Sequence, residues 1–469
     1  MIPILSGNVA SALGGAYEVA NSCRFDDGNS AYMHKTPGSA GDQQKFTFSF
    51  WIKRCALETG TAMTIFDTQA DDDNQFKIRF NDNGTLTVES KVSDHNDSLV
   101  TTQVFRDPSA WSNFVIAVDT TQGTAGNRVK IYHNGTQITA FGTENYPAEN
   151  LNTLVNAANK LYVGTSAQTD AYCDMYIAEF CLVDGQQLAA TSFGEFDEDS
   201  PQIWKPIDVS GLTFGTNGFY LDFEDSSNLG NDANGGTDLT EVNLAATDQS
   251  ISTPTNIFAS GNVLLKRGTS TVSEGNLKIQ DSAGAWQGLS TTFGASSGKW
   301  YCEWKVTAVN SNSFGVQGEA TYSISNDGTA IGFKTPSVSI LQNGDRYIDN
   351  SGASYAGSFT TNDIIGCAMD LDNHKVYFSK NGAWANGSGA WDSSTFDASV
   401  GAISLSQTSG LYFFGHSVHT ATSEANYGDP PYTISSSNSD ANGYGKMEYA
   451  FPNSSYYSLC TKNLAEFGG

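Results

Sequence analysis

The chain has few of the basic residues on which nucleic-acid-binding proteins depend. Lys and Arg number only 24 against 50 Asp and Glu, which leaves a formal net charge of −26. A charge of this size repels nucleic-acid backbones and anionic membranes at low salt, so neither is an expected partner. The sequence also lacks a P-loop, a GxSxG nucleophile motif and a GxGxxG motif before a helix.

Cysteine is present without the spacing that metal sites and redox centres use. The seven cysteines include no CxxC pair, so neither a zinc knuckle nor a thioredoxin-type site is predicted. Cys302 and Cys367 lie inside apolar strand patterns, which favours free buried thiols and synthesis in a reducing cytosol.

Long apolar runs are also missing. None reaches the roughly 18 residues that a bilayer-spanning helix needs, so membrane insertion is not expected. The apolar patch after Met1 has no basic segment before it, and the first cation is Arg24, which argues against a secretory signal.

The residues that are abundant favour strands and turns. Glycine occurs 47 times and aromatic residues make up 12% of the chain, which is too apolar for disorder.

The strongest strand pattern runs from Asn362 to Gly382. Within it, Ile365, Cys367 and Met369 alternate with residues whose side chains point to the opposite face of the strand. A turn and a second strand with Val376 follow, and Asn-Gly is a strong hairpin signal. This segment closely resembles the central hairpin of SPRY domains, which are β-sandwiches that bind partners.

The first half of the chain carries a ladder of short strands separated by turn residues, the spacing of an antiparallel sandwich. Its motifs are FTFSFWIK (Phe46–Lys53), WSNFVIAVD (Trp111–Asp119), RVKIYHNG (Arg128–Gly135), LYVG (Leu161–Gly164) and YIAEFCLVDG (Tyr176–Gly185). In this order they resemble the LamG-like domains of the concanavalin A-like lectin/glucanase fold, over about residues 22–225.

The second half resembles a SPRY domain over about residues 256–469. Gly298–Trp304, Phe314–Val316, Ala330–Phe333 and Asp363–Gly382 follow one another in the order that such a domain shows. The two resemblances imply an all-β chain of two tandem antiparallel β-sandwiches, concanavalin A-like or jelly-roll and then SPRY, with little helix. Residues 1–21 are interpreted as an N-terminal arm and candidate virion anchor. Residues 226–255, rich in Asn, Asp, Gly and Thr, are interpreted as a linker.

The segments 21–54 and 194–223 are similar to structural proteins of marine bacteriophages. That resemblance implies a non-enzymatic protein of the virion surface, made in the host cytoplasm and released by lysis. It would act as a fibre- or appendage-type adhesin that binds host surface glycans or neighbouring virion proteins, as a homo-oligomer. One alternative is a capsid-decorating or head/tail-joint protein without a receptor role, and another is a cellular adaptor with a peptide-binding SPRY domain.

A polysaccharide hydrolase is a further alternative, because the concanavalin A-like fold includes glucanases. Retaining glucanases need two carboxylates about 5 Å apart, which that family supplies as ExDxxE on one strand. The nearest sequence, Glu195 to Ser200 (EFDEDS), has the first two carboxylates but a serine in place of the third. It runs into Pro201, which favours a loop over a central strand.

Two groups of residues are candidate binding sites. Aromatic residues near predicted loops stack on sugars or anchor proteins, and the candidates of this kind are Tyr347, Tyr355, Trp384 and Trp391. The alternative for the two tryptophans is that they cover the edge of the sandwich. Asp71, Asp72 and Asp73 are candidate ligands of a calcium ion between two strands, and the alternative is a charged hairpin loop. No other cofactor is expected. His133, beside an Asn-Gly turn, is expected to be exposed.

Overall fold

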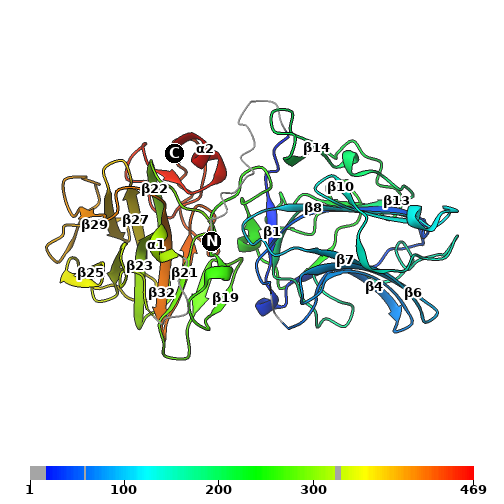
Figure 1. Cartoon of the computed structure of the whole chain (residues 1–469), viewed down its shortest axis with the longest axis horizontal. Helices are drawn as coiled ribbons and strands as arrows, with labels where there is room; N and C mark the ends of the chain where they lie inside the picture. The colour runs from blue at the N-terminus through cyan, green and yellow to red at the C-terminus, as the bar shows by residue number, and fades with distance from the viewer. Residues whose placement is uncertain (1–16, 58–59, 323–328, 469) are drawn as a thin grey trace. The chain divides into compact units, whose positions relative to one another are not determined.

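The computed structural model describes residues 17–57, 60–322 and 329–468, and almost all of their regular structure is β. These residues form two compact units, a first domain of residues 17–255 and a second domain of residues 256–468 (Figure 1). Each domain is built from two large antiparallel sheets. The expected N-terminal arm, residues 1–21, lies mainly outside the described residues.

The first sheet of the first domain has the order β10-β9-β8-β3-β13-β1-β18 within the described residues, with β16 paired to β13. Its strands are β10 (Thr136–Ile138), β9 (Val129–His133), β8 (Ser112–Asp119), β3 (Lys45–Arg54), β13 (Met175–Asp184), β1 (Ser22–Phe25), β18 (Gln249–Ser250) and β16 (Phe219–Leu221). The predicted motifs at 46–53, 111–119, 128–135 and 176–185 therefore become neighbouring strands.

The second sheet of the first domain has the order β11-β7-β6-β5-β4-β12-β2-β17 over the same part of the chain. Its strands are β11 (Phe141–Glu144), β7 (His95–Val104), β6 (Thr85–Val92), β5 (Asn74–Phe80), β4 (Met63–Asp71), β12 (Leu161–Val163), β2 (Tyr32–Lys35) and β17 (Thr240–Val242). Figure 1 shows β8 and β13 in one layer and β4, β6 and β7 in the other.

Phenylalanine rings fill the space between these two sheets. Phe48 of β3 lies 4.5 Å, between ring centroids, from Phe66 of β4, and Phe80 of β5 lies 5.8 Å from Phe114 of β8. All four rings are fully buried. Burying a phenylalanine side chain contributes about 1.5–3 kcal/mol, so this aromatic layer is a large part of what holds the sandwich together.

The alternation in β3 does not separate a buried face from an exposed one. Phe46, Phe48 and Phe50 face the core as predicted, but the intervening Thr47 and Lys53 are buried as well. The Thr47 hydroxyl donates to the Gln186 carbonyl at 2.8 Å. The outer face of this sheet is covered by later segments of the chain, so a polar residue there is buried but hydrogen-bonded.

Residues 226–255 differ from the expected linker. Within them, β17 pairs with β2, and β18 pairs with β1. Leu229 and Leu239 are 1% exposed and belong to the core of the first domain. The segment is poor in large apolar residues, but these two side chains and two short strand pairings are enough to fix it to the sandwich.

The second domain also has two large sheets in the described part of the chain. One has the order β19-β20-β33-β22-β27-β28-β29-β30, with β31 paired to β28 and β34 paired in parallel to β22. Its strands are β19 (Thr271–Ser273), β20 (Lys278–Gln280), β33 (Thr422–Asn426), β22 (Lys299–Ala308), β27 (Ile364–Asp370), β28 (Lys375–Lys380), β29 (Ala383–Ala385), β30 (Trp391–Ser393), β31 (Ile403–Ser404) and β34 (Tyr457–Ser458).

The other sheet of the second domain has the order β21-β32-β23-β24-β25-β26 among the described residues. Its strands are β21 (Gln287–Ser290), β32 (Tyr412–His419), β23 (Ser311–Gly318), β24 (Ser337–Leu341), β25 (Asp345–Ile348) and β26 (Ser351–Ser354). Trp304 of β22 stacks on Phe314 of β23 at 5.4 Å, which joins the two sheets. The short helices α1 (Glu319–Tyr322) and α2 (Thr461–Phe467) lie outside the sheets.

The predicted hairpin at 362–382 is confirmed. β27 and β28 pair antiparallel, with Cys367 opposite Phe378. Asn381 and Gly382 both have positive φ values, 50° and 79°, as a two-residue turn into β29 requires.

The seven cysteines are all free and buried. Cys302 of β22 and Cys367 of β27 are opposite one another in the sheet. In the part of the chain that the structure describes, no helix is long and apolar enough to cross a membrane.

Candidate functional site

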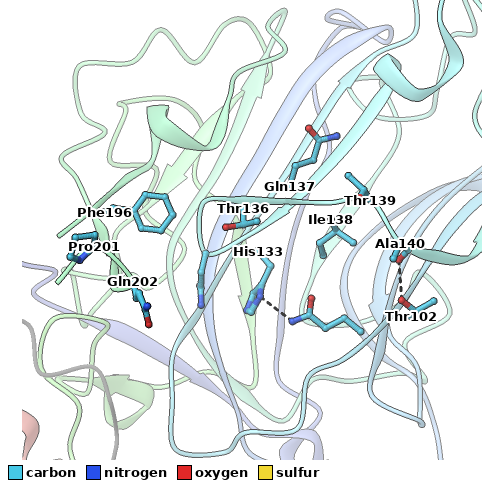
Figure 2. Close-up of a pocket in the computed structure, with 12 residues that line it drawn as sticks. Thr102, His133, Thr136, Gln137, Ile138, Thr139, Ala140, Phe196, Pro201 and Gln202 are labelled. Atoms are coloured by element: carbon cyan, nitrogen blue, oxygen red, sulfur yellow. Dashed lines mark hydrogen bonds between the residues drawn. The ribbon is translucent and has the colours of Figure 1, made fainter. Parts of the chain in front are cut away.

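A hollow of about 650 Å³ lies at one end of the first domain, within the range of small-molecule sites. Three segments form it: the end of β7, the β9–β10 hairpin with the chain that leaves it, and the hairpin of β14 (Gly194–Phe196) and β15 (Trp204–Pro206). Figure 2 shows Phe196, Pro201 and Gln202 on one side, Thr102 and Ala140 on the other, and His133 between them.

The turn between β9 and β10 is fixed by its sequence. Asn134 and Gly135 have φ values of 45° and 76°, the left-handed region that Asn and Gly tolerate best. The Asn134 amide donates to the Asn113 carbonyl at 2.9 Å, and the Asn113 amide donates to the Asn134 side-chain oxygen at 2.8 Å. These bonds hold the hairpin tip against β8.

Trp204 holds the two hairpins together. A Cβ atom on Gly135 would lie 2.3 Å from the Trp204 ring, and one on Gly194 would lie 2.5 Å from it, so the indole fills the space between two glycines. The indole Nε1 donates to the Asn113 side-chain oxygen at 3.1 Å. The tryptophan is buried, and the hairpin that carries it forms one wall of the hollow.

Among the described residues that line the hollow, Phe196 is the one large apolar side chain that is exposed to solvent. Its ring meets Trp204 edge to face at 4.9 Å, and its side chain is 44% exposed. The cross-strand pairing of Phe196 with Trp204 positions the ring. An exposed aromatic ring on a rigid hairpin is suited to stacking on a flat apolar surface, such as one face of a sugar.

His133 lies at the floor of the hollow and is neutral at pH 7. One ring nitrogen is 3.3 Å from Gln103 Nε2 and the other is 3.2 Å from the Ser112 hydroxyl. Its ring also stacks on Phe114 at 5.1 Å. Burial lowers its pKa to about 4, because the charged imidazolium is poorly solvated there. The expectation of an exposed histidine is therefore wrong: the neighbouring phenylalanines half-bury the ring.

The residues described around the hollow include no Asp, Glu, Lys or Arg. Hydroxyls and amides supply the polar groups, and they belong to Thr102, Gln103, Asn134, Thr136, Gln137, Thr139 and Gln202. Thr102 is partly engaged, because its hydroxyl donates to the Ala140 carbonyl at 3.3 Å. A hollow with an aromatic ring, neutral donors and neutral acceptors can bind an uncharged polyhydroxyl compound.

The two carboxylates of the predicted ExDxxE-like segment lie on the β14–β15 hairpin beside this hollow. Lys205 bridges them, with its Nζ 3.3 Å from Glu195 and 3.5 Å from Asp197. Asp197 also accepts hydrogen bonds from the Asp199 and Ser200 amides. The Ser200 amide bond lowers the pKa of Asp197 below its ordinary value. In this arrangement both side chains stabilise the hairpin turn.

Comparison with known families gives a separate match for each of the two sandwiches. The model of the concanavalin A-like lectin/glucanases superfamily matches residues 27–189, and the SPRY domain model matches residues 290–415. The chain carries a concanavalin A-like domain followed by a SPRY domain. Most residues that line the hollow lie within the range matched by the concanavalin A-like model, whereas Phe196, Pro201 and Gln202 lie beyond it in the same compact unit. The search of curated proteins finds no match.

Solved structures that are similar to parts of the chain include a SPRY domain, a pentraxin and a pair of laminin domains. A human SPRY domain is 16% identical, covers 34% of this chain and 94% of its own, and has a TM-score of 0.26. The heptameric SAP-like pentraxin of Limulus polyphemus is 13% identical, with coverages of 37% and 80% and a TM-score of 0.28. Domains LG4-5 of the mouse laminin α1 chain are 8% identical, with coverages of 86% and 84% and a TM-score of 0.30.

In the SPRY domain, two of the four predicted aromatic residues are buried. Tyr355 is 2% exposed, and its hydroxyl donates to the Gly401 carbonyl at 2.6 Å. Trp384 is 9% exposed and packs against Phe396. Their aromatic rings pack against the sheet, so the prediction of exposed stacking surfaces is wrong for both.

The other two predicted aromatic residues are half-buried and already in contact. Tyr347 stacks on Phe333 with 4.4 Å between ring centroids. The Trp391 indole donates to the Gly357 carbonyl at 2.8 Å. The four rings are therefore held by different partners.

The candidate calcium ligands Asp71, Asp72 and Asp73 are exposed at the turn between β4 and β5. Asp71 accepts hydrogen bonds from the Asp73 amide and from the Asn74 side chain, as an acidic turn does. Across the described residues, no group of three or more His, Cys, Asp or Glu side chains is placed to hold a metal ion.

The residues of the hollow could not be identified from sequence patterns. Phe196 and Gln202 belong to the acidic hairpin, in which only the carboxylates suggested a functional site. Thr102 and Gln103 lie at the end of a strand whose sequence suggests no site. The one local signal was the Asn134–Gly135 turn, which marks the hairpin tip. The rest depends on bringing together three segments that are far apart in the sequence.

Proposed function

We propose that the protein binds uncharged glycans through the hollow of its concanavalin A-like domain. Both of its domains belong to classes that generally bind other molecules without catalysing a reaction. The observation that carries the proposal is the exposed Phe196 ring beside a set of neutral hydroxyl and amide groups, with no charged side chain among the described lining residues. Sugar rings offer matching chemistry, an apolar face for stacking and hydroxyls for hydrogen bonding.

We further propose that the glycan lies on a host cell and that the protein is an adhesin on a bacteriophage particle. The resemblance of the segments 21–54 and 194–223 to phage structural proteins, noted from the sequence, supports this location. Weak binding at one site is sufficient for such a role, because many copies on one particle act together. Immunogold labelling of intact particles tests the location. Labelling confined to the capsid shell would favour the alternative of a decorating protein.

A glycan array with the full chain tests the binding proposal. We expect neutral oligosaccharides among the ligands, and Phe196→Ala should weaken binding at least about tenfold, because it removes the stacking surface. Phe196→Tyr should retain binding, and Leu264→Ala, which removes another exposed apolar side chain in the SPRY domain, should leave it unchanged. Equal binding by Phe196→Ala and the unaltered chain would exclude this hollow as the site.

A further inference from the structure

A second hollow, of about 350 Å³, lies in the SPRY domain. It is bounded by the end of β28, the β28–β29 turn, the loop around Phe396 and the chain segment from Tyr449 to Pro452. The last of these segments lies beyond the part of the chain that the SPRY model matches, which ends at residue 415. The hollow is therefore a feature of this chain's C-terminal segment packed on the SPRY sheet.

Five aromatic side chains line this hollow: Tyr301, Trp384, Phe396, Tyr449 and Phe451. Tyr301 and Trp384 are buried behind the others, and Phe396, Tyr449 and Phe451 are half-buried, so these three rings are the ones open to a ligand. Four of them form a continuous series of ring contacts, with centroid distances of 5.3 Å from Phe451 to Tyr301, 6.3 Å from Tyr301 to Trp384 and 4.8 Å from Trp384 to Phe396. Tyr449 stands apart, over the β28–β29 turn, where a Cβ atom on Gly382 would lie 2.8 Å from its ring. Aromatic rings therefore border the hollow on more than one side.

A buried carboxyl group lies beneath this hollow. The Tyr301 hydroxyl donates to Glu303 Oε1 at 3.1 Å, and the Tyr449 amide donates to the same oxygen at 2.8 Å. Burial, followed by the negative charges of Glu448, Glu303 and Asp363, raises the pKa of Tyr449 above its ordinary value. The carboxyl groups of Glu303 and Asp363 each lie one hydrogen bond from the lining, through the Tyr449 amide and the Asn381 side chain. None of the residues described in its lining is Lys or Arg.

We propose that this hollow binds an organic cation, a trimethylammonium group of the choline type. Aromatic rings attract such a cation through their electron-rich faces, with about 0.5–2 kcal/mol for each well-placed ring. Nearby carboxylates add a long-range attraction, and the net charge of −26 favours the approach of cations over anions. A neutral ligand of the same shape gains only the burial of its apolar surface.

Titration of the full chain with choline chloride, monitored by Trp fluorescence or calorimetry, tests the proposal. The titration is done at about pH 8, where Glu303, with a pKa raised to about 7, carries its negative charge. We expect saturable binding, and at least about tenfold weaker binding of 3,3-dimethylbutan-1-ol, which has the same shape without the charge. Phosphocholine distinguishes the source of the cation. Binding of both choline and phosphocholine indicates a phosphocholine-bearing ligand, and binding of choline alone indicates a free cation.

Variants at Tyr449 connect the binding to this hollow. Tyr449→Leu should weaken choline binding at least about fivefold, and Tyr449→Phe, which keeps the ring, should retain it. Leu264→Ala, at an exposed position of the same domain outside the lining of this hollow, is the matched control and should leave choline binding unchanged. The proposal is overturned if the neutral isostere binds as tightly as choline, if choline does not bind, or if Tyr449→Leu binds it normally. Where Tyr449→Leu does not fold, the choline-to-isostere ratio in the unaltered chain decides by itself.

Discussion

Two buried glutamates make the stability of this protein depend on pH. Burial raises the pKa of Glu303 in β22 and of Glu179 in β13 to about 7, above the ordinary value of 4.5. The pKa of each carboxyl group is higher in the folded state than in the unfolded chain, so its contribution to the free energy of unfolding is complete below about pH 4.5 and is lost as the pH rises to about 7. For each residue, the difference between the two pKa values corresponds to about 3 kcal/mol.

The two glutamates lie in different domains, so each serves as the control for the other. We expect Glu303→Gln to flatten the pH dependence of protection in β22 and β27, and Glu179→Gln to do so in β13. Amide hydrogen exchange between about pH 5 and pH 8, corrected for intrinsic exchange rates, measures this. If protection in a domain depends on pH in the same way with and without its glutamate, that glutamate is not the source of the pH dependence.

Gly135 is the residue at which the geometry of the first hollow is most sensitive to substitution. Gly135→Ala places a methyl group against Trp204 at a φ of 76°, whereas Gly185→Ala meets only the strain of a φ of 88° with no atom within 4 Å. We expect Gly135→Ala to lower the free energy of unfolding by about 1–3 kcal/mol more than Gly185→Ala does. Urea denaturation of the two variants measures this difference. Equal losses would mean that Trp204 moves aside without penalty.

At the scale of elements, the segment 226–255 is part of the concanavalin A-like domain. Leu239→Ala should lower the free energy of unfolding by about 2–5 kcal/mol, because it leaves a cavity in the core. Thr240→Ala, at an exposed position of β17, should change it by less than about 1 kcal/mol. Urea denaturation distinguishes these outcomes. A negligible effect of Leu239→Ala would restore the interpretation of the segment as a linker.

At the scale of the whole molecule, the charge of −26 acts on any charged ligand. Neutral glycans should bind with affinities that change by less than about twofold between about 50 and 500 mM NaCl, because they carry no charge to be screened. Glycans with sialic or uronic acids should bind only weakly at the lower salt concentration and improve as salt increases. Array measurements at both concentrations test this. A preference for acidic glycans at low salt would contradict the proposed ligand class.

The strands and turns were predictable because their causes are local. The period of two in Phe46–Lys53 and the Asn-Gly turn at 381–382 are properties of a few consecutive residues, and β3 and β28–β29 follow from them. Exposure was not predictable in the same way. Tyr355 and Trp384 lie next to turns as predicted, but other segments cover them, and no local pattern indicates that.

The sequence by itself determined the class of fold, the order of the two sandwiches and the net charge, because short-range patterns and composition decide these properties. The tertiary structure alone decided where binding groups meet. Phe196 and His133 face one hollow because Trp204 of the β14–β15 hairpin packs on Gly135 of the β9–β10 hairpin, and Tyr449 reaches the hollow of the SPRY domain because Glu303 binds its amide. These contacts join residues that are more than sixty positions apart in the sequence, and they form only when the chain is folded.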